Sequence, residues 1–118
     1  TLAPAFCCST FMFDNIPYLS NFEVAPDIKY INGIDEFPEV YSDLVISNYA
    51  FSELKKEVQK KYLDKVVLNS RHGYITWNNM SAEMLDGYTI EEILSIIPNA
   101  TIIDENPKTA LNNCIIIW

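Results

Sequence analysis

Three polar segments of this sequence stand directly after short apolar runs, and their side chains are of types that bind ligands or move protons. Asp14 follows residues 5–13, the polar and aromatic turn 47–52 follows residues 44–46, and Asn78 follows residues 74–77. Each apolar run has the length and composition of a strand. Parallel sheets hold their ligands just beyond the carboxyl ends of their strands, so these segments are the candidate functional positions.

Asp14 is the first candidate. A carboxylate at the carboxyl end of a strand can accept hydrogen bonds from both hydroxyl groups of a ribose. An aspartate in this place is equally able to form a turn through its own backbone, and Pro17 marks a loop soon after it. Position alone therefore leaves a ribose-binding role and a turn-forming role open for Asp14.

Glu53 and His72 are the candidate proton-transfer groups, and each has a competing interpretation. Ser52 and Glu53 stand where a helix over residues 53–68 is expected to begin. Ser52 can cap that helix, and the charge of Glu53 suits its positive first turn. His72 is the only histidine, but it precedes a strand and so lies at the amino end of the sheet, where catalysis is not expected.

Residues 44–77 form the strand–helix–strand unit that must position these groups. An apolar stripe along the expected helix faces the sheet, whereas its lysines fall mainly on solvated faces. The members of the stripe are Leu54, Val58, Tyr62 and Val66, with Leu63 and Val67 beside them. Units of this kind build parallel sheets.

The rest of the sequence predicts two helices and a strand pair. Residues 80–97 are helical, with Ser81 as a cap, a turn at Asp86-Gly87, and a capping box of Thr89 with Glu92 that opens a second helix. Pro98 ends that helix. Strands 100–103 and 114–118, joined by the polar loop 104–113, can then pair as an antiparallel hairpin. The predicted fold is α/β, with a mainly parallel sheet finished by an antiparallel pair.

Composition narrows the class of protein. The chain has 118 residues, of which 49% are hydrophobic, so we expect one domain with a substantial core. A net charge of −8 argues against nucleic-acid binding, which needs clustered Lys and Arg. The three cysteines form no metal-ligand spacing and are expected to be reduced. The absence of a signal peptide or long apolar span predicts a cytoplasmic protein without a membrane anchor.

Two segments resemble a known family. Residues 43–54 (DLVISNYAFSEL) and 62–78 (YLDKVVLNSRHGYITWN), with the ending NNCIIIW, are similar to the later half of the sugar O-methyltransferases. These enzymes are a branch of the class I S-adenosylmethionine-dependent methyltransferases. After the fourth strand their pattern has a Ser or Asn, an aromatic residue and a Ser-Glu pair. The matching residues are Ser47, Asn48, Phe51, Ser52 and Glu53, then Tyr62, Leu63 and Asn78, with 14–17 as an approximate counterpart of an Asp-x-Pro segment.

The resemblance implies a partial Rossmann-like sheet and transfer of a methyl group from S-adenosylmethionine to a sugar or other small-molecule hydroxyl. Asp14 would bind the ribose of the donor. Ser47, Asn48 and Tyr49 would form the wall of the donor site. Glu53 and Asn78 would lie on the acceptor side, with Glu53 as the base or as the group that orients the hydroxyl. No metal is implied.

One feature of that family is missing from the sequence. The methionine part of the donor is held there by a glycine-rich loop, whereas this chain has only Gly33, Gly73 and Gly87. We therefore expect the first strand and its loop to lie upstream of Thr1 or to be absent, and the chain to be a piece of a longer reading frame. The alternative is a non-catalytic α/β remnant that forms homo-oligomers through an exposed sheet edge.

Overall fold

The computed structural model describes residues 31, 33 and 35–118. Contacts divide the chain into two units, Thr1–Pro38 and Glu39–Trp118, and the elements below all belong to the second. The expected strand 5–13 and Asp14 lie outside the described residues.

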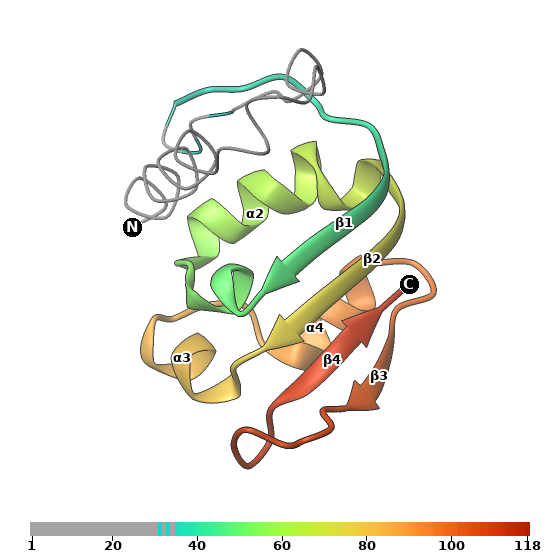
Figure 1. Ribbon diagram of the computed structural model, residues 1–118. Helices are drawn as coiled ribbons and strands as arrows, with labels where there is room; N and C mark the ends of the chain where they lie inside the picture. The colour runs from blue at the N-terminus through green and yellow to red at the C-terminus, as the bar shows by residue number, and fades with distance from the viewer. Residues whose placement is uncertain (1–30, 32, 34) are drawn as a thin grey trace, which may run out of the picture. The chain divides into compact units, whose positions relative to one another are not determined.

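The second unit alternates strands with helices (Figure 1). Its strands are β1 (Ser42–Asn48), β2 (Ser70–Trp77), β3 (Thr101–Asp104) and β4 (Cys114–Ile117). Its α-helices are α2 (Lys56–Lys65), α3 (Asn79–Met84) and α4 (Ile90–Ile96), with short 3-10 turns η2 (Ala50–Glu53) and η3 (Val67–Asn69). The predicted strand–helix–strand unit is confirmed as β1–α2–β2. Among the described residues, no helix is long and apolar enough to cross a bilayer.

The sheet has the strand order β1-β2-β4-β3. β1 and β2 are parallel, with Ser47 opposite Ile75, whereas β2–β4 and β3–β4 are antiparallel. The predicted α/β class and the antiparallel pair are confirmed. The described sheet is mixed rather than mainly parallel, because the loop between β3 and β4 is too short for the crossover that a parallel connection needs.

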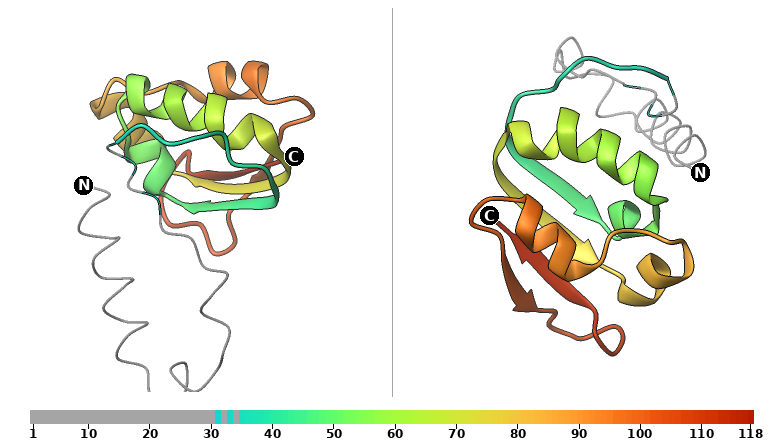
Figure 2. Two further views of the ribbon diagram at one scale, coloured as in Figure 1. Left: turned by 90° about the horizontal axis from the view of Figure 1, so that it is seen from above. Right: turned by 180° about the vertical axis from the view of Figure 1, so that it is seen from behind.

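The helices lie together on one face of this sheet, as Figure 2 shows. Ile75 and Ile116, which are paired across β2 and β4, form the centre of the core with Trp77. Leu63 of α2 and Ile93 of α4 cover them. On the opposite face of β1, the side chains of Leu44 and Ile46 are 53% and 62% exposed.

Helix α2 is shorter than predicted, and a polar residue takes part in its buried face. It begins at Lys56 rather than at Glu53, and it ends at Lys65. Gln59 is completely buried, and its amide donates to the carbonyl oxygen of Phe51 at 3.0 Å and accepts from the backbone N–H of Tyr88 at 2.7 Å. Because both ends of the amide are bonded, Gln59 is stable in the core, while Val58 and Val66 are only partly buried.

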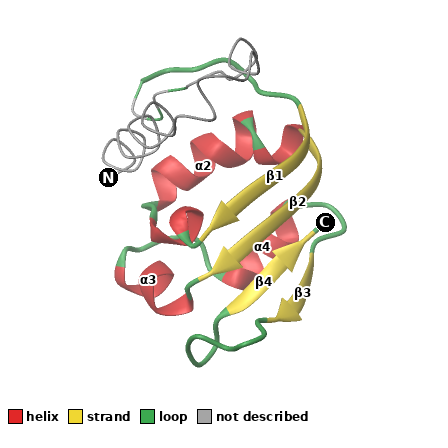
Figure 3. Ribbon diagram, in the orientation of Figure 1, coloured by secondary structure: helices red, strands yellow, loops and turns green. Residues whose placement is uncertain are grey.

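The two helices after β2, which are red in Figure 3, begin with side-chain caps. Asn78, not Ser81, caps α3, and the backbone N–H of Ser81 donates to the Asn78 side chain at 3.3 Å. The predicted Ser81 cap was wrong because the helix starts at Asn79, so that Ser81 lies within its first turn. The capping box of Thr89 and Glu92 on α4 is confirmed, and α4 ends at Ile96, ahead of Pro98.

Candidate functional site

The carboxyl ends of β1, β2 and β3 lie at the same edge of the sheet, together with the start of β4 (Figure 1). This edge holds residues 47–53 and Asn78, as the sequence indicated. It also holds Glu105, which follows β3, and Asn113, which precedes β4. His72 is exposed and lies near the other end of β2, as predicted.

The turn after β1 has an unusual backbone conformation at Tyr49. Its φ angle is 60°, in the left-handed region that non-glycine residues adopt at a cost. The Tyr49 N–H donates to the side chain and the carbonyl oxygen of Thr76, at 2.8 and 3.1 Å, which anchors the turn to β2. Ser47 supports the same turn, because its hydroxyl oxygen accepts from the N–H of Phe51 at 3.0 Å.

Ser52 joins the turn after β1 to the end of β2. Its side chain is fully buried. The hydroxyl donates to the carbonyl oxygen of Tyr49 at 2.7 Å and accepts from the N–H of Asn78 at 3.0 Å. The expectation that Ser52 caps the helix was wrong, since α2 begins four residues later and the hydroxyl is engaged at the sheet.

Glu53 ends η2 and is exposed. Helix α2 begins beyond it, at Lys56, so the predicted role in the first turn of that helix was wrong. Within the described part of the chain, its carboxylate has no hydrogen bond or ion pair. Glu53 is therefore available to a ligand at this edge.

Asn48 and Asn78 supply amide groups to the same edge. The Asn78 oxygen is used as the cap of α3, which leaves its NH2 group as the free donor. The side chain of Asn48 is exposed at the last position of β1. Among the described residues, neither of these groups has a hydrogen-bond partner.

A chain of hydrogen bonds crosses the edge and connects residues that follow or precede all four strands. We call Tyr49, Glu105, Thr109, Asn113 and Asn79 the edge network. The Tyr49 hydroxyl donates to Glu105, whose other carboxylate oxygen accepts from the hydroxyl and N–H of Thr109 at 2.6 and 3.1 Å. The Asn113 amide donates to the Thr109 hydroxyl at 3.1 Å and accepts from the N–H of Asn79 at 3.3 Å.

The charge of the edge network resides on Glu105, which is only 8% exposed. The hydrogen bond from the Thr109 hydroxyl, with further ones from Tyr49 and the Thr109 N–H, holds the pKa of Glu105 below its usual value. The hydrogen bond to Glu105 raises the pKa of Tyr49. The pair is therefore a neutral phenol and a carboxylate, and Glu105 is a weak base.

No sequence pattern singled out Glu105, Thr109 or Asn113, which were assigned to a polar loop. Their four-residue spacing was the one available signal, and that spacing is more typical of a helix. The buried Glu105 pairs with Tyr49, 56 positions away in the sequence. Such a contact is visible only in the folded chain.

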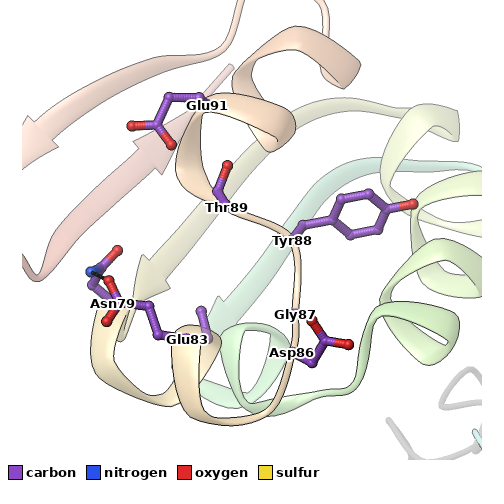
Figure 4. Close-up of a pocket in the computed structure, with 8 residues that line it drawn as sticks. Asn79, Glu83, Asp86, Gly87, Tyr88, Thr89 and Glu91 are labelled. Atoms are coloured by element: carbon purple, nitrogen blue, oxygen red, sulfur yellow. Dashed lines mark hydrogen bonds between the residues drawn. The ribbon is translucent and has the colours of Figure 1, made fainter.

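A hollow of about 390 Å³ lies between α3 and α4. Its lining is Asn79, Ala82, Glu83, Asp86, Gly87, Tyr88, Thr89 and Glu91. Figure 4 shows Asn79 beside Glu83, and the two are joined by a hydrogen bond of 2.8 Å, while the ring of Tyr88 points away from them. Asn79 thus belongs both to the hollow and, through its backbone, to the edge network.

Comparison of the chain with models of protein families, with curated proteins and with solved structures finds no match. Within the described residues, no group of three or more His, Cys, Asp or Glu side chains could hold a metal ion. In the same part of the chain, Cys114 is buried and forms no disulfide. The function of this chain is therefore inferred from its residues and their arrangement.

Proposed function

We propose that this chain is part of an S-adenosylmethionine-dependent O-methyltransferase that transfers a methyl group to a sugar hydroxyl. The observation that carries the proposal is the bridge at Ser52, which holds the turn 47–53 against Asn78 at the carboxyl edge of parallel strands. Those are the segments that resemble the sugar O-methyltransferases. The antiparallel strand pair beside β2 agrees with the same resemblance.

The polar groups at the edge fit the donor that the resemblance implies. S-adenosylmethionine carries ribose hydroxyls and charged amino-acid groups, which need hydrogen-bond donors and acceptors. The exposed amide of Asn48 and the hydroxyls of Ser47 and Tyr49 are of these types. Asp14 would accept from the ribose. When bound, the donor supplies a methyl group on a positively charged sulfur.

Glu53 and Asn78 are assigned to the acceptor. The Asn78 NH2 group would donate to the acceptor oxygen, and the Glu53 carboxylate would accept the proton of the sugar hydroxyl or orient it. The hollow between α3 and α4 supports a sugar acceptor, because its carboxylate, amide and hydroxyl groups can bond several sugar hydroxyls. Asn79 connects that hollow to the edge.

The first experiment measures the melting temperature of the protein with millimolar S-adenosylmethionine. A donor that binds only the folded state raises the melting temperature, by an amount equivalent to about 2.7 kcal/mol at a hundredfold excess over its Kd. Adenosine and methionine at the same concentration are the controls. An unchanged melting temperature up to millimolar donor contradicts the proposal.

The second experiment replaces Glu53 by Gln in a form of the protein that transfers methyl groups. We expect turnover to fall about 100-fold or more with little change in stability. A positioned base contributes that order of rate, and Glu53 makes no hydrogen bond or ion pair with the residues that the structure describes. Glu57→Gln, which removes an exposed carboxylate of α2, is the matched control. Equal turnover in wild type and Glu53→Gln refutes the assigned role of Glu53.

A second candidate function is favoured by the position of β1 at one end of the described sheet, with Leu44 and Ile46 exposed. A sheet edge with exposed apolar residues can pair with another copy of the chain, as in a non-catalytic oligomerisation domain. This candidate predicts association that rises with concentration in light scattering and is lost in Ile46→Lys. Met84→Lys, at an exposed apolar residue of α3 outside the sheet, is the control. A monomer at all concentrations excludes it.

A further inference from the structure

We propose that Glu105 is a positioning residue, whose buried carboxylate fixes the phenol of Tyr49 at the carboxyl edge and ties the loop 105–113 to the same point. The consequence for donor binding rests on the proposed function. The mechanical part of the proposal, that Glu105 holds both Tyr49 and the loop, rests only on the contacts of the edge network.

The backbone and the side chain of Tyr49 are held by different partners. Thr76 bonds the Tyr49 N–H, and Ser52 bonds its carbonyl oxygen, so the left-handed turn is anchored to the sheet. The phenol extends beyond that anchor and is held by the Glu105 carboxylate, with the Thr109 hydroxyl 3.0 Å away. Removing the carboxylate would leave the turn in place but release the aromatic ring.

The same carboxylate closes the loop after β3. One oxygen of Glu105 accepts from both the hydroxyl and the N–H of Thr109, whereas residues 106–112 are exposed. Asn113 then connects this loop to the start of α3. Its amide NH2 group donates to the Thr109 hydroxyl, and its amide oxygen accepts from the N–H of Asn79. The loop has little buried surface, so these hydrogen bonds are its main attachment to the edge.

A buried carboxylate is stable only when its oxygens are bonded, and the donors at Glu105 meet that condition. A carboxylate whose oxygens already accept these hydrogen bonds is poorly suited to proton transfer. Its effect on a ligand would therefore act through Tyr49, which the proposed function assigns to the wall of the donor site. The structure thus assigns Glu105 a place behind that wall.

The test compares Glu105→Gln, Tyr49→Phe and the double variant with a matched pair elsewhere in the chain. The Tyr41 hydroxyl also donates to a carboxylate, that of Glu39, at 2.7 Å, but this pair is exposed. Glu39→Gln removes the charge of a similar acceptor outside the edge network, and Tyr41→Phe removes the hydrogen bond itself. Tyr49→Phe keeps the ring and serves as the second variant if Glu105→Gln fails to fold.

The first readout is independent of any ligand. Lys108 lies in the exposed loop, so trypsin can cleave after it once the loop opens. We expect Glu105→Gln to raise the rate of this cleavage at least about tenfold, and Glu39→Gln to leave it unchanged. The protein is also labelled with 13C at the tyrosine ζ carbons, and the Tyr49 NMR signal is assigned by its loss in Tyr49→Phe. We expect the chemical shift of this signal to change in Glu105→Gln. Unchanged cleavage and an unmoved signal overturn the proposal.

The second readout is the Kd of S-adenosylmethionine. If Glu105 acts through Tyr49, each single variant weakens binding by a similar factor, and the double variant is no weaker than either. If the fold-loss of affinity in the double variant equals the product of the two single losses, the two residues act independently and the positioning role is overturned. Absent binding in wild type means that the proposed function fails, while cleavage and the Tyr49 signal still decide whether Glu105 holds the loop and the phenol.

Discussion

At Ser52 a single hydroxyl group connects the two turns that follow β1 and β2. The hydroxyl O–H donates to the Tyr49 carbonyl oxygen, the hydroxyl oxygen accepts from the Asn78 N–H, and the side chain is fully buried. Ser52 therefore holds together the donor-wall turn and the acceptor-side Asn78 of the proposed site.

Ser52→Ala should cost about 1–3 kcal/mol in the free energy of unfolding, because it leaves a backbone N–H and a carbonyl oxygen without a partner. Urea titration followed by circular dichroism measures the change. Ser95→Ala is the matched control, since the exposed Ser95 hydroxyl also donates to a backbone carbonyl, that of Glu92, at 2.7 Å. We expect its cost to stay below about 0.5 kcal/mol. Equal costs for the two variants disprove the bridging role.

At the scale of elements, β2 and the end of β4 meet in a close contact between Gly73 and Trp118. Gly73 and Trp118 exchange backbone hydrogen bonds of 3.2 and 3.4 Å. The indole of Trp118 lies over Gly73, where a Cβ atom would overlap its ring. Glycine is required here because the aromatic side chain of the neighbouring strand takes the space of a side chain.

Gly73→Ala should therefore destabilise the protein by about 1–3 kcal/mol, through displacement of the indole. In a Trp118→Ala background the same change should be neutral or slightly stabilising, because alanine is better than glycine in a strand. Urea titrations of the four proteins give the coupling between the two positions. Equal costs in both backgrounds would show that β4 does not lie beside β2 in this register.

For the molecule as a whole, acidic residues outnumber basic ones, 16 to 8, and some of the acids stabilise the fold. The Lys56 ammonium, with the Thr89 N–H, lowers the pKa of Glu92, and the donors of the edge network lower that of Glu105. Because these folded-state pKa values lie below the usual 4.5, the unfolded chain binds protons first as the pH falls. Their stabilisation is thus present near neutral pH and is lost in acid.

The urea midpoint should accordingly fall between about pH 5 and pH 3. Glu105→Gln should start lower at pH 7 and fall less over this range, because the variant has no carboxylate to protonate. The same applies to Glu92→Gln. Glu57→Gln, an exposed residue, should keep the wild-type slope. A wild-type slope in Glu105→Gln would contradict the charged state assigned to the edge network.

The α/β class, the β1–α2–β2 unit, the α4 capping box and the antiparallel pairing of β3 with β4 could all be predicted, because each depends on neighbours in the sequence. Apolar runs mark the strands, Thr89 and Glu92 stand three positions apart, and a short loop leaves only an antiparallel return. The edge location of Ser47, Asn48, Tyr49, Glu53 and Asn78 followed from the same local pattern.

The sequence by itself therefore determined the elements and the edge at which polar residues gather. Only the tertiary structure decided which of those residues are bonded and which are free. Ser52 became a bridge and Gln59 a core residue because each side chain bonds one nearby backbone group and one from a distant segment, Asn78 for Ser52 and Tyr88 for Gln59. Glu105 reached Tyr49 because the pairing of the four strands brings the carboxyl ends of β1 and β3 to the same edge of the sheet. Hydrogen bonds between residues far apart in sequence leave no periodic signal, so local patterns do not reveal them.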